Sequence, residues 1–131
     1  MNRTSRPSVL LLDDDQAVRE SGRRALEAYG YQCMSVDTVE DATARLRAER
    51  VEAFILDVRL PGGRSGLDLL REIRDDVRLN AVPVIIMTGS LLSAEEHALI
   101  TRLRAYLFQK PEGMRTIVTF LDQLTSRDQS H

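Results

Sequence analysis

Several residue types are scarce in this chain of 131 residues, and each scarcity excludes a class of protein. Cys33 is the single cysteine, so no internal disulfide can form, and we expect it to be a small, buried apolar residue in a strand. No apolar run exceeds four residues, whereas a membrane-spanning helix needs roughly 18. The basic segment Met1–Pro7 precedes no apolar run long enough for a signal peptide. We therefore expect a cytoplasmic protein with no membrane insertion.

Positive charge is not in excess either. The formal net charge is -2 and the isoelectric point is near 5.7, unlike the concentrated basic surface of a general nucleic-acid binder. We expect no direct contact with nucleic acid. Lysine is almost missing, because Lys110 is the sole lysine among 18 basic residues and the others are arginines.

The length suits one domain, since single domains typically run about 100–200 residues. Hydrophobic residues make up 43% of the chain and charged residues 29%, which is an ordinary globular composition. We expect one domain over residues 8–124, with short flexible termini at residues 1–7 and 125–131. If the chain ends naturally there, no effector domain follows, and the protein acts as a single domain.

Short apolar runs alternate with segments whose apolar residues recur at helical spacing. The predicted strands are Ser8–Asp13, Gln32–Val36, Ala53–Val58, Pro83–Met87 and Ala105–Phe108. The predicted helices are Gln16–Tyr29, Asp37–Glu49, Gly66–Asp75, Ser93–Leu103 and Met114–Leu124, and capping boxes Asp37–Glu40 and Ser93–Glu96 open the second and fourth. Five such strand–helix units predict an α/β fold with a parallel sheet and helices on both faces.

Polar residues lie at, or directly after, the carboxyl ends of four of these strands. They are the run Asp13–Asp15, Asp57, Thr88 and Lys110. Taken singly, each has an ordinary interpretation: a helix N-cap for the aspartates, a turn residue for the threonine and a solvated lysine. Ligands of an open parallel sheet bind beyond the carboxyl ends of its strands, so together these residues predict one site on one rim.

Four motifs carry a family resemblance. They are Val9–Asp15, Phe54–Pro61, Pro83–Gly89 and Lys110–Pro111, in this order and on the expected strands. Over Ser8–Leu124 the chain resembles the receiver domain of two-component response regulators. The resemblance implies a flavodoxin-like (βα)5 fold with strand order 2-1-3-4-5. It also implies a signalling domain rather than an enzyme, which accepts a phosphoryl group on Asp57 from a sensor histidine kinase or a histidine phosphotransfer protein.

Three carboxylates in one pocket, those of Asp13, Asp14 and Asp57, repel each other and need a cation. Mg²⁺ suits them because it prefers oxygen ligands and is often held by carboxylates together with phosphate oxygens. The resemblance implies that Asp14 and Asp57 bind Mg²⁺ directly, that Asp13 acts through water, and that the backbone carbonyl of Arg59 completes the protein ligands.

The remaining site residues suit phosphoryl transfer, which needs positioning and charge neutralisation. Lys110 supplies a compact cation for the phosphoryl oxygens, and Thr88 supplies a hydroxyl that can turn toward a new phosphate. The resemblance implies that the Ser93–Leu103 helix, the Ala105–Phe108 strand and the last helix form the surface that signals to a protein partner, with exposed candidates Glu95, Arg102, Arg104 and Arg115. It also allows a homodimer on activation.

The sequence departs from the family pattern at a few positions. Four residues, Gly62–Ser65, separate Pro61 from Gly66, which makes this loop one residue longer than usual. Leu107 occupies the usual aromatic switch position, and Glu112 replaces the usual aromatic after Lys110–Pro111. Arg59 and Ser90 stand at positions that tune the lifetime of the phosphoryl group in the family, and we expect Arg59 to influence dephosphorylation.

Two other interpretations stay open. The altered loop and the missing aromatic allow a receiver-like interaction module that phosphorylation does not regulate. The run Asp13–Asp15 also satisfies the Asp-x-Asp that opens the signature of haloacid-dehalogenase-type phosphatases, although that interpretation leaves Asp57 unexplained.

Overall fold

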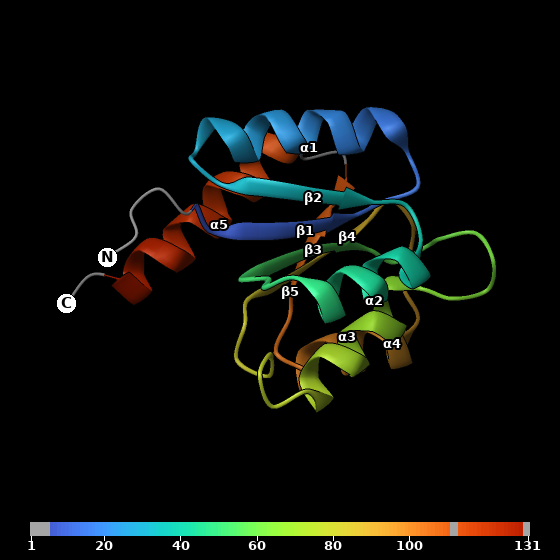
Figure 1. Cartoon of the computed structure of the whole chain (residues 1–131). Coiled ribbons are helices and arrows are strands. Elements are labelled where there is room, and N and C mark those ends of the chain that lie inside the picture. Colours follow the sequence, from blue (N-terminus) through green and yellow to red (C-terminus); the bar gives the residue numbers. More distant parts are fainter. Residues whose placement is uncertain (1–5, 111–112, 130–131) are drawn as a thin grey trace.

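The computed structural model describes residues 6–110 and 113–129 of the chain (Figure 1). Five parallel strands form one sheet in the order β2-β1-β3-β4-β5, as predicted. The strands are β1 (Ser8–Leu12), β2 (Gln32–Val36), β3 (Ala53–Asp57), β4 (Val84–Thr88) and β5 (Tyr106–Gln109). The helices are α1 (Gln16–Ala28), α2 (Val39–Ala48), α3 (Gly66–Asp75), α4 (Ala94–Arg102) and α5 (Met114–Gln129).

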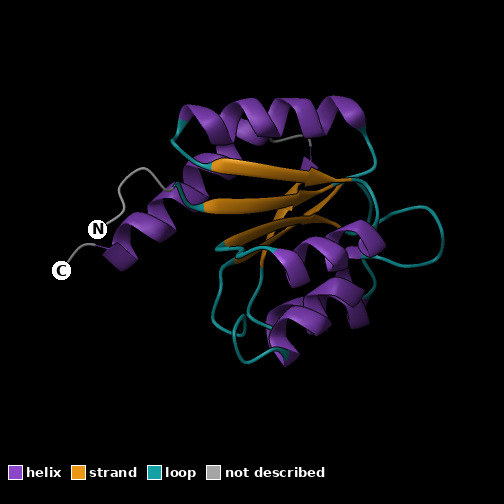
Figure 2. Cartoon of the chain, in the orientation of Figure 1, coloured by secondary structure: helices purple, strands orange, loops and turns teal. Residues whose placement is uncertain are grey.

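Helices cover both faces of the sheet (Figure 2). Alternate residues of a strand point to opposite faces, and β1 follows this rule: Val9 and Leu11 pack toward α1 and α5, while Leu10 and Leu12 pack toward α2, α3 and α4. All four side chains are completely buried. This two-sided burial explains why the central strands are continuously apolar rather than alternating.

Local signals predicted the helix starts well, with one error. Ser93 caps α4 in a complete capping box with Glu96, as expected. The expected box at Asp37 is wrong, because Thr38 is the N-cap of α2 and its hydroxyl accepts from the Asp41 backbone N–H at 3.0 Å. The error is a shift of one residue between two neighbours that can both cap a helix.

The last helix is longer than its apolar pattern indicated. It continues to Gln129, whereas the sequence placed the domain boundary at Leu124. The buried Tyr31 hydroxyl lies 2.9 Å from Asp122 Oδ1 and 2.5 Å from Thr125 Oγ1, so polar contacts attach this part of α5 to the start of β2. Such contacts do not appear in a hydrophobic pattern.

Arg74 ties three segments together from its position in α3. Its guanidinium donates to the carbonyls of Leu103 (2.7 Å) and Arg104 (3.3 Å), at the carboxyl end of α4. It also donates to the carbonyls of Val82 (2.8 Å) and Leu79 (3.3 Å), in the segment that leads into β4. Burial lowers the pKa of this arginine, consistent with a guanidinium enclosed by the fold.

Within the described part of the chain, none of the helices combines the length and apolar character that crossing a bilayer requires. Cys33 is half-buried in β2, and burial raises the pKa of its thiol to about 11. The thiol is therefore protonated at neutral pH, in agreement with the apolar role expected for it.

Candidate functional site

Three polar side chains are buried where β1, β3 and β4 end. Asp13 follows β1 and is 0% exposed, Asp57 ends β3 and is 3% exposed, and Thr88 ends β4 and is 0% exposed. Buried carboxyl groups are costly unless they are paired or bind a cation. Their gathering on the carboxyl rim of the sheet marks this rim as the candidate site.

The acidic cluster consists of Asp13, Asp14 and Asp57. One carboxylate oxygen from each lies within 4.8 Å of the others, and Asp14 is the exposed member. Asp57 pairs with Met87 of β4 in the sheet register, so its backbone is held by hydrogen bonding on a central strand. The structure thus brings together the three carboxylates predicted to share a pocket.

Lys110 closes the cluster from the end of β5. Its Nζ atom lies 2.9 Å from Asp13 Oδ2 and 3.1 Å from Asp57 Oδ2. Burial acts to lower the pKa of the ammonium, but the contacts with Asp13 and Asp57 outweigh it, so the pKa is raised overall. The sole lysine of the chain therefore stays charged between two buried carboxylates.

The pKa of Asp57 is raised to about 6, well above the ordinary value of 3.8. Burial is the largest cause, and the negative charge of Asp13 adds to it. Lys110 opposes the shift without cancelling it. At neutral pH without a metal ion, the ionised Asp57 is thus held in an unfavourable environment.

The third aspartate of the run has a different task. Asp15 is the N-cap of α1, and its carboxylate accepts from the backbone N–H groups of Ala17 (2.8 Å) and Val18 (3.4 Å). Asp13 Oδ1 in turn accepts from the Asp15 backbone N–H at 2.8 Å. The ordinary interpretation as a helix cap is therefore confirmed for Asp15, while Asp13 and Asp14 belong to the cluster.

The donor set of this cluster fits Mg²⁺. All three side chains offer carboxylate oxygens, which a hard cation such as Mg²⁺ prefers. Asp13 Oδ2 is fully buried, and apart from its ion pair with Lys110 it has no hydrogen-bond partner among the described residues. A single ammonium thus faces three neighbouring carboxylates, and a divalent cation would stabilise such an excess of negative charge. The predicted contribution of the Arg59 carbonyl stays a prediction.

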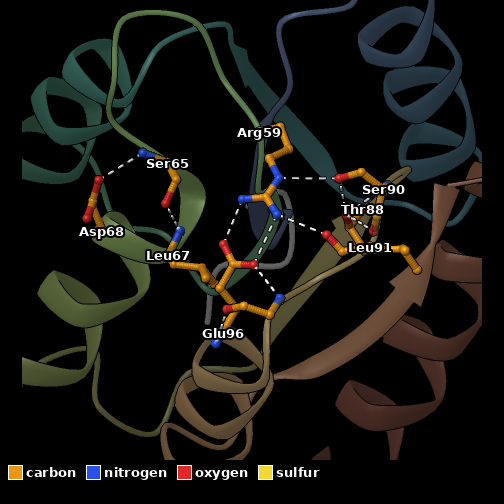
Figure 3. Close-up of polar contacts among 9 residues, drawn as sticks. Arg59, Ser65, Leu67, Asp68, Thr88, Ser90, Leu91 and Glu96 are labelled. Atoms are coloured by element: carbon orange, nitrogen blue, oxygen red, sulfur yellow. Dashed lines mark hydrogen bonds and ion pairs between the residues drawn. The ribbon is translucent and has the colours of Figure 1, made fainter.

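Arg59 directs its side chain to the start of α4 (Figure 3). Its Nη1 and Nη2 atoms lie 2.6 and 3.0 Å from the two carboxylate oxygens of Glu96. It also donates to Ser90 Oγ at 3.3 Å and to the Leu91 carbonyl at 3.0 Å. The hydroxyl of Thr88 points into the same turn, where it donates to the Ser90 carbonyl at 3.0 Å and accepts from the Ser90 N–H at 3.1 Å.

Two residues of this site had escaped the sequence reasoning. Glu96 was expected only to cap α4, because 37 residues separate it from Arg59 and nothing local pairs them. Gly66 begins α3 so close to β3 that a Cβ atom on it would lie 2.1 Å from the Asp57 carbonyl oxygen. The longer loop before Gly66 indicated an unusual connection, but it did not point to this contact.

Comparison with known proteins agrees with this geometry. A family model described as the response regulator receiver domain matches residues 9–122, which is most of the chain. The chain belongs to this family. Receiver domains are signalling domains of two-component systems, so the class predicted from the four motifs is confirmed.

Curated relatives of this receiver domain are longer proteins. The transcriptional regulatory protein GltR of Pseudomonas aeruginosa is 41% identical over 83 residues, which are 63% of this chain and 34% of GltR. The KDP operon transcriptional regulatory protein KdpE of Escherichia coli is 28% identical over 107 residues, or 82% of this chain and 46% of KdpE. The chain thus spans a third to a half of these relatives.

Solved structures share the fold over nearly the whole chain. A response regulator receiver protein from Pseudomonas putida is 29% identical with a TM-score of 0.79, covering 91% of this chain and 98% of that one. A CheY-like receiver domain from Methanospirillum hungatei has a TM-score of 0.83 at 24% identity and covers 94% and 96% of the two chains. The flavodoxin-like fold with strand order 2-1-3-4-5 is therefore confirmed.

This receiver domain also has the departures that the sequence indicated. Gly62 and Gly63 adopt φ of 88° and 84°, which glycine tolerates better than other residues, so both glycines accommodate the longer loop. Leu107 is half-buried against the core on the α2, α3 and α4 side of the sheet. Pro111 and Glu112 lie outside the described residues.

Proposed function

We propose that this receiver domain accepts a phosphoryl group on Asp57 from a phosphohistidine of a sensor histidine kinase or a histidine phosphotransfer protein. One observation carries the proposal: the carboxylate of Asp57 ends a central strand beside Asp13 and 3.1 Å from Lys110 Nζ. A nucleophilic oxygen, a cation for the transferred group and a cluster of metal-type ligands thus meet on one rim.

The transfer exchanges one bond for another. An oxygen of the Asp57 carboxylate forms a bond to phosphorus while the phosphorus–nitrogen bond of the phosphohistidine breaks, and the electron pair of that bond goes to the imidazole. Mg²⁺ held by Asp14 and Asp57, with Asp13 acting through water, would neutralise charge on the phosphoryl oxygens. Lys110 is already close enough to Asp57 to pair with the group that forms there.

Thr88 would respond to the phosphoryl group on Asp57. Its hydroxyl is fully buried at the end of β4 and bonds the Ser90 backbone in the unphosphorylated state. A phosphoryl group on Asp57 offers strong acceptor oxygens on the same rim, so the hydroxyl gains a competing partner. Rotation of Thr88 would then alter the turn that leads into α4.

The signal would leave through α4, β5 and α5 to a protein target. Side chains exposed on or beside these elements include Glu95, Arg102, Arg104, Tyr106 and Arg115. Tyr106 is 42% exposed, and its ring packs edge-on against Phe120 of α5 with centroids 5.0 Å apart, so it joins β5 to α5 at the surface. We place this exchange between protein partners in the cytoplasm.

One observation argues against the phosphatase alternative. That interpretation needs Asp13 and Asp15 to act together, yet Asp15 is exposed and caps α1. Asp57, which the phosphatase signature leaves unexplained, is instead a buried member of the cluster. An interaction module without phosphorylation remains the alternative that the next experiment addresses.

The test compares the wild-type protein with Asp57→Asn and with the matched control Asp15→Asn. Each is incubated with acetyl phosphate, with and without Mg²⁺, and its intact mass is measured. We expect the mass of one phosphoryl group on wild type and Asp15→Asn only with Mg²⁺, and none on Asp57→Asn. No gain by wild type would contradict phosphorylation, and a gain kept by Asp57→Asn would move the acceptor to another residue.

A further inference from the structure

The Arg59 side chain connects the strand that bears Asp57 to the first turn of α4. Glu96 Oε1 accepts from Arg59 Nη2 at 3.0 Å and also from the Ser93 N–H at 2.8 Å (Figure 3). The same carboxylate therefore caps the helix and holds the arginine. Arg59 also donates to Ser90 and Leu91. One guanidinium therefore contacts both the segment between β4 and α4 and the first turn of α4.

Phosphorylation of Asp57 would compete with Glu96 for the Arg59 guanidinium. Arg59 is two positions after Asp57, and a guanidinium binds phosphate oxygens with the same paired geometry that it uses for a carboxylate. A phosphoryl group carries a charge of about -1.5 to -2 and three acceptor oxygens, against the single charge of Glu96.

The ion pair between Arg59 and Glu96 is also weak. The Arg59 side chain is 50% exposed and that of Glu96 is 23% exposed, and ion pairs so open to water stabilise a fold only slightly. Glu96 would keep its bond from the Ser93 N–H after Arg59 departs, so the helix cap survives the loss.

We propose that the Arg59 guanidinium changes partner on phosphorylation, leaving Glu96 for the phosphoryl oxygens on Asp57, and thereby releases the first turn of α4. This inference rests on the proposed function and assigns Arg59 and Glu96 as positioning residues that act on the switch. The release also reaches Thr88, because its hydroxyl and the Arg59 side chain both bind Ser90.

Four variants test the exchange. Glu96→Gln keeps a side chain that can cap α4 but removes the charge that holds Arg59, and Glu95→Gln is its control in the same turn. Arg59→Gln removes the mobile group. Arg64→Gln is its control, because Arg64 lies in the loop after Arg59 and pairs with Glu72 of α3 at 2.7 Å.

The readout is amide hydrogen exchange of residues 89–97, measured before and after acetyl phosphate with Mg²⁺, with intact mass recorded on each sample. In the wild type we expect phosphorylation to accelerate this exchange about two- to fivefold, the factor that corresponds to losing one exposed ion pair. Unphosphorylated Glu96→Gln should already exchange faster by that factor, and phosphorylation should then add little. Both control variants should behave like the wild type.

Intact mass distinguishes a failure of phosphorylation from a failure of the partner exchange. A wild type that gains no phosphoryl mass overturns the proposed function and the partner exchange with it. A phosphorylated Arg59→Gln that still shows the full wild-type acceleration, relative to its own unphosphorylated form, overturns the partner exchange alone. The partner exchange is also overturned if the amide hydrogens of residues 89–97 exchange at the wild-type rate in unphosphorylated Glu96→Gln.

Discussion

Lys110 illustrates what a single side chain contributes at the residue scale. Its Nζ atom contacts Asp13 Oδ2 at 2.9 Å and Asp57 Oδ2 at 3.1 Å, which places one compact charge between two buried oxygens. An ammonium is a compact charge with three rotatable donors, whereas a guanidinium is a larger fork whose donors are fixed in one plane. All the remaining basic residues among the 18 are arginines. The shape of the site therefore accounts for the lysine at this position.

Lys110→Arg should therefore retain charge but impair phosphoryl transfer. Loss of one well-placed charge-assisted hydrogen bond costs about 1.5–3 kcal/mol, which corresponds to a rate roughly 10- to 100-fold lower. The rate of phosphoryl gain from acetyl phosphate, followed by intact mass, measures the effect. Arg102→Lys, a basic exchange on the exposed end of α4, serves as the control. A wild-type rate in Lys110→Arg would mean that charge alone suffices.

Asp57 links its own burial to the stability of the whole protein. Its pKa is about 6 in the fold and about 3.8 in an ordinary environment. Between these values the folded state keeps a proton that the unfolded chain has released. The free energy of unfolding therefore falls as pH rises through this window, and the loss is complete above about pH 6.

Asp57→Asn should remove this pH-dependent loss in the free energy of unfolding. In buffer without divalent cations we expect it to raise the free energy of unfolding by about 1–3 kcal/mol at pH 8 and to change it little near pH 4. Urea unfolding at the two pH values measures the difference, and Asp75→Asn, an exposed carboxyl outside the cluster, controls for general charge. An equal gain at both pH values would show that the effect is not titration of Asp57.

At the scale of elements, α3 begins in unusually close contact with β3. A Cβ atom on Gly66 would lie 2.1 Å from the Asp57 carbonyl oxygen and 3.3 Å from Leu56 Cβ. The Gly66 N–H also donates to the Val58 carbonyl at 3.3 Å. The first turn of α3 can approach β3 this closely only because its first residue lacks a side chain.

Gly66→Ala should push α3 and β3 apart. We expect a loss of about 1–3 kcal/mol in the free energy of unfolding, the usual cost of an added atom in a packed site. Gly89→Ala is the matched control on the same rim, because its Cβ would meet Lys110 atoms only at 3.6 and 3.8 Å. Urea unfolding of both variants decides the point, and equal stabilities would show that α3 adjusts without strain.

The sequence predicted the elements and the grouping of the rim residues, but it missed some side-chain contacts between elements. Strands such as Val84–Thr88 were recognisable because burial on both faces demands a continuous apolar run. Asp13, Asp57 and Lys110 were predictable as a group because parallel strands end on one rim. The pairing of Arg59 with Glu96 was not, since it depends on how a loop and a helix start meet in space. The extent of α5 was missed for a similar reason, because polar side chains attach it to Tyr31.

At the scale of the molecule, the acidic cluster makes folding and metal binding interdependent. Asp13, Asp14 and Asp57 come from two strand ends that only the folded sheet brings together. A cation that binds these carboxylates binds the folded state alone, and the stabilisation it adds grows with the logarithm of its concentration above the dissociation constant. Without it, the fold has to tolerate the burial and the repulsion that together raise the pKa of Asp57.

Mg²⁺ should accordingly raise the thermal midpoint of the protein. At ten times its dissociation constant it should add about 1.4 kcal/mol to the free energy of unfolding, and a chelator should remove that gain. Asp14→Asn should lose most of the effect, whereas Asp15→Asn, next to it but outside the cluster, should keep it. Thermal unfolding with a Mg²⁺ titration provides the measurement. Equal Mg²⁺ gains in the two variants would show that Asp14 is not a ligand.

Arginines fasten both ends of α4, and the two attachments differ in kind. At the carboxyl end, the half-buried Arg74 binds the carbonyls of Leu103 and Arg104. At the amino end, the exposed Arg59 binds the carboxylate of Glu96. The carbonyls that bind Arg74 are neutral and lie away from Asp57, whereas the proposed phosphoryl group on Asp57 would compete with Glu96 for Arg59. The helix would then pivot about its carboxyl end, so displacement of its surface grows toward Ala94 and vanishes near Arg102.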